Sequence, residues 1–212
     1  MRHSENRRRF TMGTKKSEIG NPGNGGKAAI DLCKPYTVTA TINGNADLLM
    51  HRWDCDSVKE KSVAAKGSAA KKTDNLESYV YRDEDGFICV PGEYIRQSIL
   101  GAAKFKQDPR SPRKCAVDIV KAGVFSLTDL CSLGVKDWDY EDRRRVQVMR
   151  AGITRTRPAM KAGWRAEVSL IVNLPEYLSL NFVHELLNDA GRLIGIGDFR
   201  PTFGRFLVSA FN

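Results

Sequence analysis

The chain has 212 residues, a hydrophobic content of 42% and a formal net charge of +9. This length and hydrophobic content suit one large or two small domains, and no apolar run approaches the length of a membrane-spanning helix. The positive charge favours nucleic acid or another polyanion as the partner, although a basic protein without such a partner has the same composition.

The cysteines and histidines form no metal-binding pattern. An odd number of cysteines without a closely spaced pair is typical of reduced thiols, so we expect a cytoplasmic protein without a metal or other cofactor. The arginines near the N-terminus have no apolar segment after them, and we therefore expect no signal peptide. The five cysteines are Cys33, Cys55, Cys89, Cys115 and Cys131.

The first part of the chain is polar, basic and rich in glycine. Residues 1–30 cannot bury enough apolar surface to offset their chain entropy, and they predict a flexible basic arm. Such an arm either contacts RNA or a neighbouring subunit, or it is a solvated tail. Residues 31–212 are predicted to form a single domain.

A strand and a basic insertion follow. Residues 36–42 are β-branched and alternate in polarity, which predicts the first strand. Residues 48–50 are apolar and are expected in the core. We interpret residues 44–78 as an insertion, in which the lysine-rich stretch 54–75 is either a solvated face or part of a binding surface.

The next residues predict a hairpin, a helix and a second insertion. Residues 79–81 and 87–90 predict two short strands joined by a turn. Residues 93–104 predict a helix with one apolar face. Residues 107–142 are interpreted as the second insertion, which begins with a loop that contains two prolines.

The most basic segment lies between residues 143 and 166, with eight lysines and arginines and no acidic residue. Residues 143–150 alternate as a strand would, and residues 164–172 alternate with one buried face. The stretch 151–163 between them is bounded by glycines and is too long for a tight turn. It predicts an extended β-hairpin arm rich in arginine and threonine.

The chain ends with a helix, a loop of glycines and arginines, and a strand. Residues 180–190 predict the helix, with Ser179 as N-cap and Gly191 as C-cap, and residues 203–211 predict the strand. Without the insertions the order is β-α-β-β-α-β. This order predicts an α+β fold with a ferredoxin-like arrangement, as in RNA-recognition domains. The aromatic stacking signature of those domains is absent, so RNA binding would depend on loops and arginines.

Two motifs resemble the RAMP superfamily of CRISPR effector subunits. The first, GFICVPGEYIRQSIL over residues 86–100, is similar to the family's strand-to-helix junction I-P-G-S-S-L-K-G. The second, GIG at 195–197 followed by FGRF at 203–206, is similar to the glycine-rich loop before the last strand of many RAMP domains. The two serines of the family pattern are Glu93 and Tyr94 here, and a glutamate at that point would repel a phosphate.

Within this superfamily the chain most resembles the backbone subunit of CRISPR ribonucleoprotein complexes. The resemblance implies a ferredoxin-like palm with inserted fingers and a β-hairpin thumb, here residues 151–163. It also implies copies that polymerise as a helical filament along a guide RNA, with the complementary target and other effector subunits as further partners.

Basic side chains are expected to hold the RNA phosphates, and backbone amides near two glycines to approach the sugar–phosphate chain. Such contacts read no bases, which suits a protein that holds any guide sequence. For any one arginine, a surface salt bridge is the alternative. The candidate RNA-binding residues are Arg96, Lys104, Arg150, Arg155, Arg157, Lys161, Gly195, Gly197, Arg200 and Arg205.

No motif identifies a catalytic residue. Some RAMP proteins cut target RNA with an aspartate in the loop after the first strand, and Asp47, Asp54 and Asp56 lie in the comparable region, with His51 nearby. We expect these to be solvated loop acids, and His184 has no evident partner, so a non-enzymatic subunit is predicted. The alternatives are a single-stranded-DNA-binding or annealing protein, an RNA-cleaving nuclease, and a phage structural protein with incidental charge.

Overall fold

The structure is a computed structural model that describes residues 34–53, 59, 63, 75–148 and 151–212. The predictions for the N-terminal arm, for the lysine-rich stretch and for Asp54, Asp56 and Arg150 lie outside the described residues.

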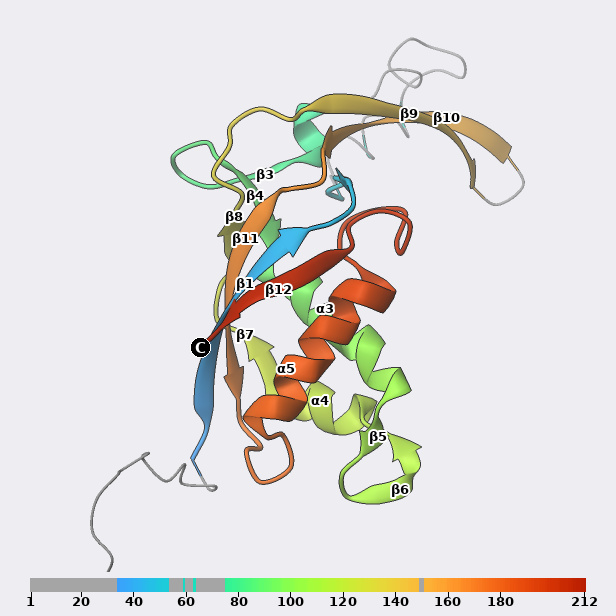
Figure 1. Ribbon diagram of the computed structural model, residues 1–212. Helices are drawn as coiled ribbons and strands as arrows, with labels where there is room; N and C mark the ends of the chain where they lie inside the picture. Colours follow the sequence, from blue (N-terminus) through green and yellow to red (C-terminus); the bar gives the residue numbers. More distant parts are fainter. Residues whose placement is uncertain (1–33, 54–58, 60–62, 64–74, 149–150) are drawn as a thin grey trace, which may run out of the picture. The chain divides into compact units, whose positions relative to one another are not determined.

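An antiparallel four-stranded sheet with the order β12-β1-β11-β7 forms the centre of the fold (Figure 1). Strand β1 (Tyr36–Gly44) pairs with β11 (Arg165–Val172) on one side and with β12 (Phe206–Phe211) on the other. Strand β7 (Val124–Ser126) pairs with the other edge of β11. The strands predicted over residues 36–42 and 164–172 are confirmed, whereas the last strand begins at Phe206.

Three helices lie on one face of this sheet: α3 (Gly92–Ala102), α4 (Val117–Gly123) and α5 (Leu180–Asp189) (Figure 1). Their apolar sides join the inward-facing residues of the strands in one core. In β11 every second side chain is buried, as the two-residue period of a strand requires. The α+β class is confirmed by this arrangement.

The two longer helices follow their sequence signals closely, except at one end. The Ser179 hydroxyl accepts a hydrogen bond from Phe182 N at 3.3 Å, which confirms the predicted N-cap of α5. The predicted C-cap at Gly191 is wrong, because the chain continues as a π-helical turn, η3 (Ala190–Ile194). Gly191 is needed for packing instead, since a Cβ there would lie 2.2 Å from the Phe206 carbonyl oxygen.

A second, three-stranded sheet contains the strand before α3. Strand β3 (Tyr81–Arg82) pairs with β4 (Ile88–Pro91), which also pairs with β8 (Leu130–Ser132). The turn between β3 and β4 uses Gly86 at a φ of +82°. The predicted hairpin is therefore confirmed, but Tyr79, the first residue of the predicted strand 79–81, ends a short 3₁₀ turn, η1 (Glu77–Tyr79).

Much of the stretch 107–142 belongs to the core and is not an insertion. Helix α4 and strand β7 bury Ile119, Val120 and Val124 almost completely. The predicted loop at 107–114 is a short hairpin of β5 (Gln107–Asp108) and β6 (Ser111–Cys115). These elements have two to seven residues each, too few for a hydrophobic period to identify them.

The long hairpin differs from the prediction in its limits. It is formed by β9 (Tyr140–Val148) and β10 (Ala151–Met160), with Val148 opposite Ala151. Residues 143–148 are therefore the first arm of the hairpin and not a separate strand, and the hairpin spans 140–160 instead of 151–163. Both arms alternate with the same period, so the pattern alone does not say which segments pair.

At its base the hairpin is tied to the segment after β1. Strand β2 (Leu48–Leu49) pairs with the end of β10, and both of its residues are buried. The core position expected for residues 48–50 is confirmed, so the first part of the predicted insertion 44–78 belongs to the body of the fold. The hairpin extends from this base away from the central sheet (Figure 1).

Candidate nucleic-acid interface

The two sequence motifs meet at one pocket of about 300 Å³. Val90 and Pro91 from the strand-to-helix junction line it on one side, and Gly197, Asp198 and Arg200 from the C-terminal loop line it on another. Segments about a hundred residues apart in the sequence thus form a single concave surface. We call it the junction pocket.

The C-terminal loop, residues 195–205, is held in place by its backbone. Asp198 N donates to the Leu49 carbonyl oxygen at 2.9 Å, and Gly204 N donates to the Asp47 carbonyl oxygen at 2.7 Å. A Cβ on Gly197 would lie 2.6 Å from the Leu49 oxygen, and the φ of Gly197 is +77°. The close approach that glycine permits is therefore used by the loop itself against β2. Gly195 has a φ of +73° and ends η3.

Arg157, a predicted phosphate ligand, is a buried brace between the hairpin and this loop. It is 4% exposed, and its Nε donates to Asp198 Oδ2 at 2.5 Å. Its guanidinium carbon lies 4.9 Å from the centre of the Phe199 ring, a cation–π contact. Its Nη1 is buried and has no hydrogen-bond partner in the part of the chain that the structure describes. A side chain in this position cannot reach an external phosphate.

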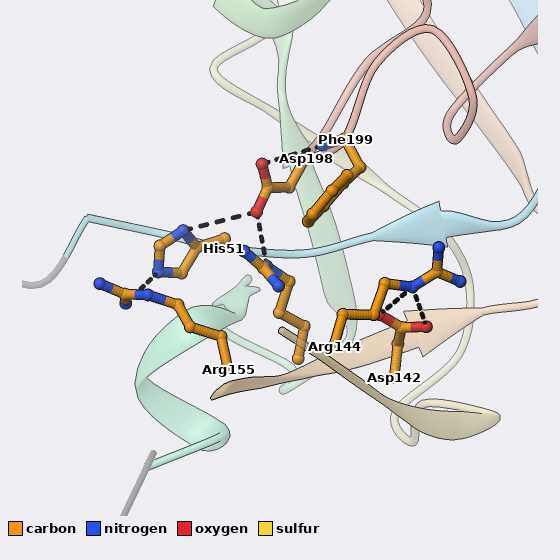
Figure 2. Close-up of polar contacts among 7 residues, drawn as sticks. His51, Asp142, Arg144, Arg155, Asp198 and Phe199 are labelled. Atoms are coloured by element: carbon orange, nitrogen blue, oxygen red, sulfur yellow. Dashed lines mark hydrogen bonds and ion pairs between the residues drawn. The ribbon is translucent and has the colours of Figure 1, made fainter. Parts of the chain in front are cut away.

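Asp198 connects this brace to the surface (Figure 2). Its Oδ1 accepts from Phe199 N at 2.9 Å, and its Oδ2 lies 3.7 Å from His51 Nδ1. The other ring nitrogen of His51, Nε2, lies 3.4 Å from Arg155 Nη1. Arg155 is half-buried, so it is the predicted hairpin arginine that both joins the network and reaches the surface.

Arg144 is an unpredicted member of the same face of the hairpin. It lies opposite Arg155 in the β9–β10 ladder, a placement that is unfavourable for two like charges unless other groups offset it. Its Nε donates to both carboxylate oxygens of Asp142 at 2.8 Å, and its guanidinium carbon lies 4.4 Å from the centre of the Phe203 ring. These contacts hold the base of the hairpin against the C-terminal loop.

The opposite face of the hairpin presents a different set of side chains. Arg143 and Arg145 point there because side chains alternate across a strand, and they lie opposite Thr156 and Thr154. Both arginines are exposed, and neither has an ion pair among residues 34–53, 75–148 and 151–212. The strand period of two predicts that Arg143 and Arg145 share one face of the hairpin. It does not say whether this face is the outer one until the inner face is known.

Arg96 is also used inside the fold, where its side chain is 13% exposed. Its Nε donates to the Val124 carbonyl oxygen at 2.7 Å and its Nη2 to the Lys121 carbonyl oxygen at 3.0 Å. Nη1 pairs with Glu93 Oε1 at 2.9 Å, and the guanidinium carbon lies 5.0 Å from the centre of the Phe125 ring. Arg96 thus fastens α3 to α4 and β7.

Replacing Arg96 with alanine should therefore lower the free energy of unfolding by about 1–3 kcal/mol, because it leaves two carbonyl oxygens without their charged donor. Urea denaturation followed by circular dichroism measures this loss. The Arg96→Lys variant should be nearly as unstable, since an ammonium cannot reproduce the forked donor geometry. A stable Arg96→Ala protein with weakened RNA binding would instead support the role that the sequence predicts.

The other predicted basic residues are exposed but scattered. Lys104 lies in the 3₁₀ turn η2 (Ala103–Phe105) after α3, Lys161 follows β10, and Arg205 precedes β12. Arg200 alone among these lines the junction pocket. The structure thus brings Arg155, Arg157, Gly197 and Arg200 together, and it places Arg96 elsewhere.

The candidate catalytic groups that the structure describes are engaged in packing. Asp47 accepts hydrogen bonds from the Tyr140 hydroxyl at 2.6 Å and from Ala162 N at 2.9 Å. Burial, together with this bond, raises the pKa of Tyr140 to about 12. His184 stacks on Phe211, with ring centres 4.6 Å apart. Among the described residues, no group of three or more histidine, cysteine or acidic side chains is arranged to hold a metal ion.

Within the described ranges, none of the helices combines the length and hydropathy that crossing a membrane requires.

No protein-family model and no curated protein matches the sequence. Among solved structures, the chain matches one chain of the cryo-EM structure of the type III-B Cmr-beta bound to cognate target RNA, with 8% identity and a TM-score of 0.50. That match covers 84% of this chain and 60% of the other, so this chain spans less than two thirds of its relative.

Two further matches have lower TM-scores. Cmr6 from Pyrococcus furiosus matches with 11% identity and a TM-score of 0.45, over 86% of this chain and 100% of the other. A chain of the Csm3–Csm4 subcomplex in the type III-A CRISPR-Cas interference complex matches with 15% identity and a TM-score of 0.32. This match covers 86% of this chain and 78% of the other.

At 8% identity and a TM-score of 0.50, the match to the chain of the type III-B Cmr-beta structure shows a shared fold.

Proposed function

We propose that this protein is an RNA-binding backbone subunit of a CRISPR effector complex, one that holds a guide RNA without reading its sequence. The observation that carries the proposal is the junction pocket. There, the strand-to-helix junction and the C-terminal loop meet at the base of an arginine-rich hairpin. A concave site beside a basic hairpin suits the sugar–phosphate backbone of an RNA strand that crosses the surface.

In this proposal the four-stranded sheet is a palm of ferredoxin type. Its order β12-β1-β11-β7, with antiparallel neighbours and helices on one face, supports the assignment. In chain order these strands are the fourth, first, third and second of the palm. The β9–β10 hairpin is then the thumb.

The arginines divide into two groups with separate roles. Arg155 and Arg200, beside the junction pocket, contact phosphates, and Arg143 and Arg145 contact further phosphates on the opposite face of the hairpin. Arg144 and Arg157 hold the hairpin on the C-terminal loop and so fix the direction in which the first group points. Phosphate contacts carry no sequence information, so any guide can be held, and further copies can bind along the same strand.

The proposal is tested with RNA and DNA strands of equal length and matched sequence, over a salt series from about 50 to 200 mM. Fluorescence anisotropy should show binding to RNA that weakens steeply as salt increases. A clear preference for DNA would contradict the proposal and favour a single-stranded-DNA-binding protein. Absence of binding to either strand at moderate salt would contradict it as well.

A further inference from the structure

The junction pocket is lined by more aromatic side chains than a phosphate site requires. Tyr79, Tyr81, Tyr94 and His51 all contribute to its walls, together with apolar residues of β2. The rings of Tyr81 and Tyr94 are nearly perpendicular, at 89°, with centres 6.0 Å apart. A flat ligand that lies in this corner contacts the face of one ring and the edge of the other, the two arrangements that aromatic groups prefer.

Polar groups are placed around this aromatic corner. The hydroxyl oxygens of Tyr81 and Tyr94 lie 3.4 Å apart, and each hydroxyl can donate and accept hydrogen bonds. Burial raises the pKa of Tyr94 to about 12, above the ordinary value for tyrosine. The Gln97 side chain donates its amide Nε2 to Glu93 Oε1 at 2.5 Å, which leaves its carbonyl oxygen as an acceptor. These are the groups that recognise the edge of a nucleobase.

The rim of the pocket carries a cation. Arg200 lines the pocket, is exposed, and has no hydrogen bond or ion pair within the described part of the chain. A strand that placed one base in the pocket would bring its phosphate to this rim. The volume of about 300 Å³ is at the lower limit of small-molecule sites, which suits one ring system and not a longer stretch of RNA.

We propose that the junction pocket binds one unstacked nucleobase of the RNA strand, with Tyr94 as the stacking surface, Gln97 at the base edge and Arg200 at the adjoining phosphate. The inference rests on the proposed function, because RNA supplies the base, but it adds a contact that phosphate binding does not need. At one position of the bound strand, the base itself then contributes to affinity.

The test uses the shortest RNA that binds with full affinity, in which each nucleotide in turn is replaced by an abasic ribose. For the unmodified protein, one position should stand out: loss of its base should weaken binding about 5- to 150-fold, the equivalent of one base–aromatic stack. Loss of a base elsewhere should change affinity less than about twofold. A 2-aminopurine at the sensitive position should be quenched on binding.

Two variants test whether the effect of the missing base arises in the junction pocket. Gln97 is exposed on α3, so Gln97→Trp should fill the pocket mouth without unfolding the protein, and it should bind intact and abasic RNA equally. Tyr94→Leu removes the stacking ring, so this variant should also bind intact and abasic RNA equally. Arg143→Ala is the matched control. It should weaken the binding of intact and abasic RNA by the same factor, so the ratio of the two affinities should not change.

The outcomes separate this inference from the proposed function. Salt-sensitive RNA binding in which every abasic position has the same small effect would overturn the base pocket and leave the proposed function intact. An abasic effect that persists in Gln97→Trp and Tyr94→Leu would also overturn it, because the base would then lie elsewhere. Failure to bind RNA at all contradicts both.

Discussion

An alanine in place of Asp198 should destabilise the protein by about 3 kcal/mol, near the lower end of the range for breaking a buried ion pair. The reason is Arg157, which is 4% exposed and would keep its charge without a carboxylate. The side chain of Asp198 is itself 32% exposed, so water compensates for part of the loss. Urea denaturation at pH 7 measures the change in the free energy of unfolding.

Two controls show whether the buried charge causes this loss. The double variant Asp198→Ala, Arg157→Met removes both partners and should recover most of the stability, since an apolar replacement of a buried pair is often neutral. Glu84→Ala, in an exposed turn, should change stability by less than about 0.5 kcal/mol. If Asp198→Ala were as mild as Glu84→Ala, the hairpin would not be braced by this pair.

Removing Arg143 and Arg145 together should weaken RNA binding about tenfold at moderate salt, which corresponds to roughly 0.7 kcal/mol for each exposed charge pair. The salt dependence should also become shallower, by about 1.4 units of log K against log salt for two phosphate contacts on a single strand. Thermal stability should stay the same, because both side chains are exposed. Fluorescence anisotropy over a salt series measures both quantities.

Arg113→Ala is the matched control for this experiment. Arg113 is also an exposed arginine on a hairpin, but its strand, β6, lies at the opposite end of the described structure from β9 and β10 (Figure 1). It should leave affinity and salt slope nearly unchanged. If Arg113→Ala changed the logarithm of the affinity by half as much as Arg143→Ala with Arg145→Ala, the loss per charge would be the same at both places; binding would then follow net charge alone, and the interface proposed for the hairpin would be lost.

The parts of the fold that the sequence predicts well are those with a long enough period. Strands β1 and β11 alternate over eight or nine residues, and α5 has both an apolar face and a capping serine. Strand β7 has three residues and α4 has seven, so no pattern marks them before the sheet is assembled. The sequence therefore predicts a strand of the central sheet at residues 143–150, which alternate because they form one arm of the long hairpin, whereas β7 occupies that place in the sheet.

The candidate site could be predicted by region but not by residue. The two motifs do lie together, and the hairpin is rich in exposed arginine. However, distant partners decide which arginines are free. Arg157 is paired with Asp198, 41 residues later, and Arg96 is held by carbonyl oxygens of α4 and β7. Composition and spacing contain no sign of such contacts, because they arise only when the elements pack.

The central claim, that the junction pocket and the hairpin form an RNA-binding surface, is tested most directly by crosslinking. RNA that contains 4-thiouridine would be bound at moderate salt, irradiated and digested, and the crosslinked peptides identified by mass spectrometry. We predict crosslinks within residues 88–97, 140–160 and 195–205. Crosslinks concentrated on the β5–β6 hairpin, or spread evenly over the surface, would contradict it.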